Sequence, residues 1–157
     1  MSSVEISAKA IIRRMEYTDL DRVVEIESEL FSDDWNEVMF QQEIVAHDAF
    51  VYEIAGKVIG YICGWLMYQE YNITNVAICK EFQGRGLGSV LLNFIMKRVN
   101  DLDCPEIFLE VRASNVAAIK LYEKSGFHLA GRRTKYYKNP EEDALLMVLS
   151  GEETDER

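Results

Sequence analysis

Three apolar runs rich in β-branched and aromatic residues follow one another in the first half of this chain, and the connections between them are short. The first two, within AFVYEIAGKVIGYICGWLMY (49–68), meet at Ala55-Gly56, a pair suited to a tight hairpin turn. The third, NITNVAI (72–78), follows a polar turn at Gln69-Glu70. Such short turns join antiparallel neighbours, because a parallel connection needs about a dozen residues or more. The sequence therefore predicts an antiparallel meander at the centre of the fold.

Strand-like and helical patterns alternate on both sides of this meander. Before it we predict a strand at 10–15 and two helices. We expect Thr18 to cap the first helix, whose apolar positions run from Leu20 to Leu30. The second helix begins after Asp33 or Asp34, and its predicted buried residues are Trp35, Phe40 and Ile44. After the meander we predict a helix from Gly86 to about Val99, a strand at 106–111, a helix at 115–126 and strands at 128–137 and 144–149.

The predicted order of elements is β-α-α-β-β-β-α-β-α-β-β, which defines a mixed α/β fold. A length of 157 residues suits one domain with one core. We see no internal repeat, low-complexity tract or linker, so we expect a single domain over residues 1–157 whose ends, 1–7 and 150–157, are frayed tails.

Composition excludes several classes of function. A formal net charge of −10 argues against binding nucleic-acid phosphates and is compatible either with a basic partner or simply with a solvated acidic surface. The three cysteines form no CxxC pair and have no histidine cluster beside them, so we predict reduced thiols in a reducing compartment and no metal site. No apolar window approaches the roughly 18 residues of a membrane span, and no leader is visible, so we expect a cytoplasmic protein that does not bind membranes.

A glycine-rich loop lies between the third run of the meander and the following helix. In CKEFQGRGLGSVLL, Gln83, Gly86 and Gly88 form the pattern Q-x-x-G-x-G, with an additional glycine at Gly84. Glycines allow close approach of the backbone to a ligand, and the start of a helix favours an anion, so a pyrophosphate suits this loop. Neither the G-x-G-x-x-G pattern of a dinucleotide fold nor a Walker G-K-[ST] is present. A glycine turn that merely links strand to helix is the alternative.

This loop resembles the acetyl-CoA loop of the GNAT superfamily of N-acetyltransferases, whose pattern is [Q/R]-x-x-G-x-[G/A] between a strand and the central helix. The segment LEVRASNVAAIKLYEKSGF, followed by RRTKYY and then EDALLM, resembles the RimI-type ribosomal-protein alanine N-acetyltransferases within that superfamily. The resemblance covers nearly the whole chain. From residue 73 to 149 the amino acids themselves match, whereas before residue 73 the match is in pattern more than in residues.

The resemblance implies a fold and a cosubstrate. The fold is a central mixed, mostly antiparallel sheet, splayed between its fourth and fifth strands and flanked by about four helices. The cosubstrate is acetyl-CoA, with no metal. The main chain of Val76, Ala77 and Ile78 would pair with the pantetheine arm, although Val76 and Ile78 can equally be core residues. The pyrophosphate would contact Gly84, Arg85, Gly86, Leu87, Gly88 and Ser89, although Arg85 can also be a solvated loop arginine.

A glutamate interrupts the apolar strand EIFLEV. Side chains alternate along a strand, so Glu110 shares a face with Phe108 and Arg112 and not with the more apolar Ile107, Leu109 and Val111. A solvated glutamate, or one paired with Arg112, is the simple interpretation. The resemblance favours a general base, because an ammonium group must lose a proton before it can attack a thioester.

The helix after Glu110 offers an acid. Asn115, Ala118, Ile119 and Tyr122 are spaced i, i+3, i+4, i+7 and therefore share one face. In the resembling enzymes the asparagine contacts the cofactor and the tyrosine donates a proton to the departing thiolate of CoA. Tyr122 can instead be a core tyrosine, and Ser114 or Asn115 can serve only as a helix cap.

The residues alone do not distinguish among several classes of acceptor amine. By resemblance, Trp35, Tyr136 and Tyr137 would bind the substrate, although paired tyrosines are often a packing feature. The resemblance implies acetylation of a protein N-terminal amine, and in particular of the N-terminal alanine of small-subunit ribosomal protein eighteen, a basic partner. The alternatives are an acetyltransferase for lysine, a polyamine or another small amine, and a non-catalytic acyl-CoA-binding regulatory domain.

Overall fold

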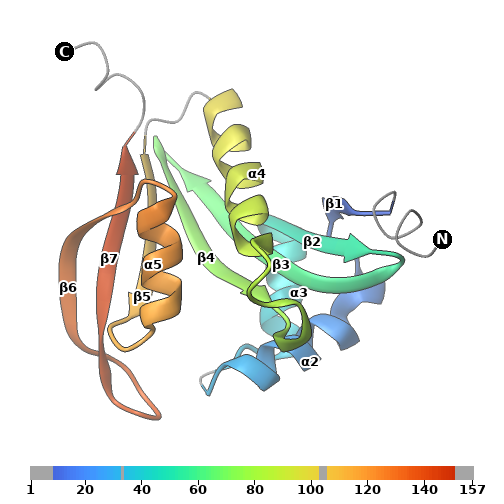
Figure 1. Ribbon diagram of the computed structural model, residues 1–157, viewed down its shortest axis with the longest axis horizontal. Helices are drawn as coiled ribbons and strands as arrows, with labels where there is room; N and C mark the ends of the chain where they lie inside the picture. Colours follow the sequence, from blue (N-terminus) through green and yellow to red (C-terminus); the bar gives the residue numbers. More distant parts are fainter. Residues whose placement is uncertain (1–8, 33, 103–105, 151–157) are drawn as a thin grey trace. The chain divides into compact units, whose positions relative to one another are not determined.

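The computed structural model describes residues 9–32, 34–102 and 106–150. Its elements follow the predicted order, with two short 3-10 helices in addition. They are β1 (Ile11–Arg14), η1 (Tyr17–Asp19), α2 (Leu20–Leu30), α3 (Glu37–Ala46), β2 (Asp48–Ile54), β3 (Lys57–Met67), β4 (Glu70–Ile78), η2 (Lys80–Phe82), α4 (Leu87–Asp101), β5 (Glu106–Arg112), α5 (Val116–Lys124), β6 (His128–Tyr137) and β7 (Glu142–Ser150) (Figure 1).

The strands form one mixed sheet in the order β1-β2-β3-β4-β5-β7-β6. The pairs β1 with β2, β2 with β3, β5 with β7 and β6 with β7 are antiparallel, whereas β4 and β5 are parallel. The parallel pairing joins Glu70–Ile73 to Glu106–Leu109, which is only the first part of each strand. The mixed, mostly antiparallel sheet is confirmed, and β4 and β5 are the strands at which it was predicted to open.

The chain divides into two compact units, and neither is continuous in sequence. Unit 1 comprises the described residues of Met1–Gly64 and Asn75–Leu91, and unit 2 those of Trp65–Thr74 and Leu92–Arg157. The divisions fall inside β3, β4 and α4 and not in a linker. For that reason we still propose one domain, as predicted.

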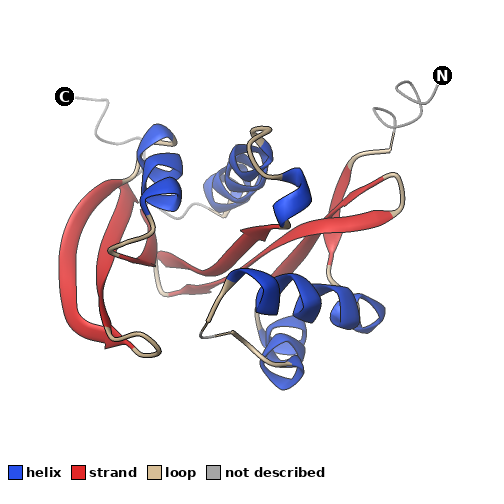
Figure 2. Ribbon diagram, turned by 60° about the horizontal axis from the view of Figure 1, so that its bottom comes forward, coloured by secondary structure: helices blue, strands red, loops and turns tan. Residues whose placement is uncertain are grey.

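In unit 1, α2 and α3 lie side by side against the strands β1 to β3 (Figures 1 and 2). Helix α2 is amphipathic, and its Leu20, Val23 and Ile26 are buried. The predicted hairpin turn between β2 and β3 is confirmed, because Ala55 and Gly56 both have positive φ. Apolar burial on this side of the sheet therefore follows the periodicity of the sequence.

The helix starts in unit 1 differ from the prediction. Thr18 does not cap α2, because residues 17–19 form η1 and a capping box joins Glu16 to Asp19. Helix α3 begins after Asn36, whose side chain accepts a hydrogen bond from the Met39 N–H at 3.0 Å. Asp34 lies outside the helix, and Asp33 lies outside the described residues.

The predicted buried side of α3 is correct only in part. Phe40 is buried, but Trp35 precedes the helix and, like Ile44, is half-buried.

The second turn of the meander is one residue earlier than predicted, because β3 ends at Met67 and β4 begins at Glu70.

In unit 2, α5 lies alongside β5 (Figure 1). The alternation predicted for β5 is confirmed, because Ile107, Leu109 and Val111 are buried and the residues between them, Glu110 included, are half-buried. Ser150 is the last residue of β7 and pairs with Glu106, so the predicted tail begins one residue too early. The other predicted tail residues, 1–7 and 151–157, lie outside the described residues.

Cysteine chemistry and membrane spans can be checked over the described residues. Cys63 and Cys79 are buried and free, whereas Cys104 lies outside the described residues. No group of three or more potential metal-ligating side chains occurs in the part of the chain that the structure describes. Within the same part, no helix has the length and apolarity needed to cross a membrane.

Candidate active site

In unit 1 the glycine loop is attached to the end of β4 by its glutamine. The Gln83 side chain donates a hydrogen bond from Nε2 to the carbonyl oxygen of Ile78 at 2.8 Å. Gly84 and Gly86 have φ of 79° and 81°, a region that other residues rarely adopt. A Cβ at either position would meet nothing within 4 Å, so the backbone conformation and not the available space requires glycine.

The loop leads directly into the first turn of α4. The first N–H groups of a helix have no partner within it, and its positive dipole end favours anions. The first turn of α4 contains no acidic residue. Arg85 Nη2 donates to the Glu81 carbonyl oxygen at 3.3 Å, and its guanidinium lies 4.9 Å from the Phe82 ring centroid. These residues fit a pyrophosphate group.

The strand that precedes the loop is mostly buried. Ala77 and Ile78 are buried and Val76 is half-buried, so burial by itself is compatible with a core role. Gly60 lies beside them, and a Cβ there would come within 2.6 Å of the Ala77 carbonyl oxygen. Glycine at position 60 thus allows β3 to approach the backbone that is predicted to hold the pantetheine arm.

In unit 2, Glu110 has two partners on β6. Its carboxylate forms an ion pair with Arg133, and its side chain is 25% exposed. Arg112, the partner that the sequence considered for Glu110, contacts Glu142 at 3.0 Å. Burial, the charge of Glu110 and a hydrogen bond with Glu110 raise the pKa of the Tyr136 hydroxyl. Glu110 is thus hydrogen-bonded and yet accessible.

Arg112 holds the turn between β6 and β7 instead. Its guanidinium donates to the carbonyl oxygens of Lys138 at 2.8 Å and Pro140 at 3.0 Å, and it lies 4.5 Å from the Tyr137 ring centroid. Hydrogen bonds from Ser114, and then from Arg112, hold the pKa of the Glu142 carboxyl below its ordinary value. Sequence reasoning missed this anchor, because no local spacing connects Arg112 to a turn 26 residues away.

Tyr122 is buried on α5. Burial, and then the neighbouring Tyr137, raise the pKa of its hydroxyl above the ordinary tyrosine value. A tyrosine with a raised pKa keeps its proton at neutral pH and can donate it. The ring packs against Phe127 with centroids 5.9 Å apart, so the predicted core contacts are present as well.

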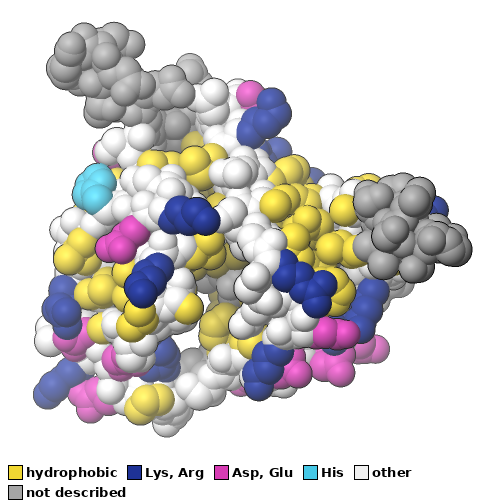
Figure 3. Space-filling view, viewed as in Figure 1, with side chains coloured by type: hydrophobic (Ala, Val, Ile, Leu, Met, Phe, Trp, Pro, Cys, Tyr) yellow, Lys and Arg dark blue, Asp and Glu magenta, His cyan; other side chains and the backbone are white. Residues whose placement is uncertain are grey.

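Asn115 caps α5, as predicted. Its Oδ1 accepts from the Ala118 N–H at 3.1 Å. The cap uses only the carbonyl end of the amide, and the NH₂ end is the part that could donate to a ligand. Around this cap, the outer surface of α5 carries acidic and basic side chains among apolar ones (Figure 3).

Four of the predicted residues form one connected group in unit 2. Glu110 forms a hydrogen bond with Tyr136, the rings of Tyr136 and Tyr137 meet edge to face at 5.1 Å, and Tyr137 acts electrostatically on the Tyr122 hydroxyl, whose pKa it raises. The structure thus links the predicted base to the predicted acid through the tyrosine pair that was predicted to bind substrate.

Trp35 lies in unit 1, where its backbone N–H donates to Oε2 of Glu27 at 3.1 Å and its ring packs on Phe40 at 5.1 Å. Glu27 is only 2% exposed, and sequence reasoning did not single it out. One signal was available: Glu27 is seven residues after Leu20 and so continues the apolar stripe of α2.

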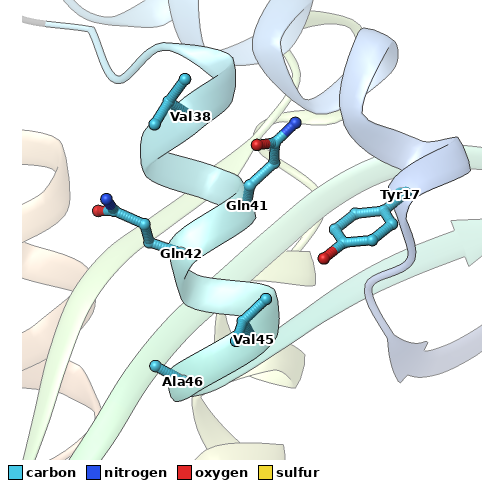
Figure 4. Close-up of a pocket in the computed structure, with 6 residues that line it drawn as sticks. All are labelled: Tyr17, Val38, Gln41, Gln42, Val45 and Ala46. Atoms are coloured by element: carbon cyan, nitrogen blue, oxygen red, sulfur yellow. The ribbon is translucent and has the colours of Figure 1, made fainter.

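A shallow depression of about 300 Å³ lies between η1 and α3, also in unit 1 (Figure 4). It is lined by Tyr17, Val38, Gln41, Gln42, Val45 and Ala46. None of these was predicted as a site residue, and the Tyr17 phenol is the single ionisable group among them. The depression therefore lacks the groups that acyl transfer requires.

The chain is similar to known acetyltransferases. The model of the acetyltransferase (GNAT) family matches residues 20–127. The alanine N-acetyltransferase of ribosomal protein bS18 from Escherichia coli (strain K12) is 33% identical over 141 residues, which cover 88% of this chain and 95% of that protein. The N-alpha-acetyltransferase of Sulfurisphaera tokodaii is 29% identical over 152 residues, 87% of this chain and 90% of that protein.

The fold is similar to the crystal structure of the ribosomal-protein-S18-alanine N-acetyltransferase from Escherichia coli. The two structures superpose with a TM-score of 0.83 at 32% sequence identity, and the match covers 90% of this chain and 93% of that protein. The chain belongs to the GNAT family of acetyltransferases. It is an N-acetyltransferase that uses acetyl-CoA.

Proposed function

We propose that this enzyme acetylates a protein N-terminal amine, and specifically the N-terminal alanine of ribosomal protein bS18. The observation that carries the chemistry is the connected group of unit 2, in which Glu110 and Tyr122 are joined through Tyr136 and Tyr137. The choice of acceptor rests on the 33% identity to the Escherichia coli enzyme that is named for this substrate.

Acetyl-CoA supplies an activated acetyl thioester. Glu110 accepts a proton from the acceptor ammonium, directly or through one water, and the neutral amine then attacks the acetyl carbonyl carbon. Tyr122 donates its phenolic proton to the departing sulfur as the C–N bond forms and the C–S bond breaks. The nitrogen then loses its second proton to solvent, and the Tyr122 phenolate takes a proton from solvent, which yields the neutral amide and restores the phenol. An α-amino group, with a pKa near about 8, loses its proton more readily than a lysine near about 10.4. Direct attack requires no acyl-enzyme, so the buried Cys63 and Cys79 take no part.

The cofactor contacts are distributed over the residues predicted for them. The main chain of Val76, Ala77 and Ile78 would bind the pantetheine amides, and the loop from Gly84 to Ser89, including Arg85, would bind the pyrophosphate. The amide of Asn115 would donate to the cofactor. Support comes from the positive φ of the loop glycines and from the absence of acidic residues in the first turn of α4.

The acceptor would contact Trp35, Tyr136 and Tyr137. A ribosomal protein is basic, which suits a chain with a net charge of −10. The cytoplasmic location predicted from the sequence is compatible with that substrate.

Mass spectrometry of peptides incubated with the enzyme and acetyl-CoA tests the acceptor. Three peptides are compared: one with a free alanine N-terminus, one with a different free N-terminus, and one with a blocked N-terminus and an internal lysine. Acetylation confined to the free alanine end is the expected result. Acetylation of lysine alone would favour the rival acceptor class and contradict this proposal.

A double variant, Glu110→Gln with Tyr122→Phe, tests the chemistry separately. It should bind acetyl-CoA nearly as tightly as the wild type while turnover falls. If turnover survives, these two residues are not the base and the acid. A wild type that binds acetyl-CoA and transfers nothing would instead support a non-catalytic acyl-CoA-binding domain.

A further inference from the structure

The α2 carboxylate of Glu27 has no role in the reaction described above, although it is 2% exposed. Burying a carboxylate is costly unless hydrogen bonds replace its hydration. Three groups of unit 1 donate to it: the Tyr61 hydroxyl at 2.6 Å, the Asn75 side-chain amide at 2.8 Å and the Trp35 N–H at 3.1 Å. All three are neutral, so the site holds a carboxylate with directional donors and not an ion pair.

The three donors come from three separate segments. Trp35 lies in the connection between α2 and α3, Tyr61 lies on β3, and Asn75 lies on β4 immediately before Val76. Aromatic rings reinforce the connection, because Phe40 packs on Trp35 at 5.1 Å and on Tyr61 at 5.5 Å. Glu27 therefore fixes the backbone at Trp35 relative to the strand predicted to hold the cofactor.

The two carboxylate oxygens of Glu27 accept from different parts of unit 1. Oε1 accepts from Tyr61 and Asn75, which are both on strands, whereas Oε2 accepts from the Trp35 N–H. Only the Oε2 contact reaches the segment predicted to bind the acceptor. Because a hydrogen bond to a backbone N–H is directional, it sets the path of the chain as well as the packing of the ring.

We infer that Glu27 is a positioning residue for acceptor binding: through Oε2 it holds the Trp35 segment in the conformation that receives the substrate. This inference rests on the proposed function, since Trp35 is assigned to the acceptor there. This positioning role is distinct from stabilisation of the fold, to which all three hydrogen bonds contribute.

The variant Glu27→Gln separates the two roles. A glutamine whose oxygen occupies the Oε1 position still accepts from Tyr61 and Asn75, but it turns its NH₂ group toward the Trp35 N–H. The variant thus loses the loop contact selectively. Tyr61→Phe is the matched control, because it removes a hydrogen bond to the same carboxylate, at Oε1, and leaves Trp35 bound.

We expect Glu27→Gln to raise the KM for the acceptor peptide by roughly tenfold, as for the loss of a hydrogen bond to a charged group, and to leave the KM for acetyl-CoA within about twofold. Tyr61→Phe should lower Tm but change the acceptor KM by less than about twofold. Equal changes in acceptor KM for both variants would show that Glu27 is only structural, and so would an unchanged KM in Glu27→Gln.

Two further points keep the test decisive. If Glu27→Gln does not fold, Glu27→Asp replaces it. The shorter aspartate side chain keeps the charge but cannot reach both sets of donors, so the KM for the acceptor peptide should again rise while the KM for acetyl-CoA does not. If the acceptor KM does not rise in this way, the inference is overturned. If the wild type acetylates no N-terminal amine in the peptide assay, the proposed function fails first and this inference fails with it. A wild type that acetylates the peptide while the variants show no split overturns this inference alone.

Discussion

At the scale of single residues, the side chains proposed for chemistry have other partners in the protein. Glu110 is bound by Arg133 and Tyr136, and Tyr122 packs on Phe127 beside Tyr137. The alternative that the sequence left open for Tyr122, a core tyrosine, describes its contacts, whereas Glu110 is ion-paired with Arg133, a partner that the sequence analysis did not consider. These contacts do not conflict with catalysis, because a base and an acid must be held in place.

Tyr122→Phe isolates the role of the phenolic proton. Tyr122 is protonated at neutral pH, as a tyrosine of ordinary pKa already would be, so the hydroxyl can act as the general acid, and its removal should lower kcat by roughly 10² to 10⁴. The KM for acetyl-CoA and the Tm should change little, which a thermal melt checks alongside steady-state kinetics. An unaltered kcat would mean that water protonates the leaving thiolate.

Arg133→Gln tests whether the ion pair on Glu110 competes with substrate. The acceptor ammonium needs the carboxylate that Arg133 now pairs with, and Arg133 is 59% exposed. Exposed pairs contribute only about 0 to 1 kcal/mol, so removing Arg133 should lower the acceptor KM by roughly twofold to fivefold.

The matched control is Arg132→Gln, on the same strand. Arg132 is 55% exposed and pairs with Asp143, away from Glu110. Its replacement changes the net charge equally and should leave the acceptor KM unchanged. A higher KM in Arg133→Gln, or the same effect in both variants, would rule out competition at Glu110.

At the scale of elements, residues that connect neighbouring segments determine the local geometry. Gln83 ties the glycine loop to the end of β4, and Arg112 ties β5 to the β6–β7 turn. In the N-terminal part, Asp19 joins η1 to β1: its carboxylate accepts two 2.9 Å hydrogen bonds from Arg13 on β1 and one from the Glu16 N–H at 2.7 Å. Arg13 in turn contacts Glu53 on β2 at 2.9 Å.

The Asp19 contacts predict a pH dependence of stability. Burial by itself would raise the pKa of Asp19, but the hydrogen bonds and charge of Arg13, together with the Glu16 N–H, leave it lower than in the unfolded chain. The stabilisation is therefore present above the unfolded pKa of about 3.9 and is lost as pH falls through the lower folded value. We expect urea unfolding to show a loss of stability below about pH 4.

Asp19→Asn should weaken this dependence, while Glu142 and Asp143, whose pKa values are also lowered, keep their contributions. At neutral pH it should lower the free energy of unfolding by about 1 to 3 kcal/mol, because Arg13 loses a charged, bidentate partner. Asp21→Asn, an exposed change on the following helix, is the control and should have little effect. If both variants retain the acid dependence of the wild type, Asp19 is not its source.

At the scale of the whole molecule, the dominant property is the net charge of −10. A negative protein attracts a basic substrate over a distance limited by the Debye length, so salt should weaken the encounter. The KM for a lysine- and arginine-rich acceptor peptide should rise severalfold between about 0.05 and 0.3 M NaCl. A neutral peptide of the same N-terminus is the control and should show little change. Equal salt dependence for both would mean that charge does not guide the substrate.

The amino-acid sequence alone was sufficient to predict the order of the elements, the buried face of β5 and the position of the glycine loop. These features depend on local rules: hydrophobic periodicity, turn residues, and glycines where φ must be positive. The helix starts were less predictable, because several polar residues in a row can each cap a helix. Glu16 is the N-cap of η1, which precedes α2, and Asn36, not Asp34, caps α3.

The partners of the polar residues depend on tertiary contacts. Glu110 pairs with Arg133, 23 positions away, and Glu27 accepts from Asn75, 48 positions away. No periodicity encodes such pairs, because they depend on which strands become neighbours and on how much water is excluded there. Local spacing determines which face a side chain occupies, whereas the sheet brings together the donors and acceptors that meet on that face.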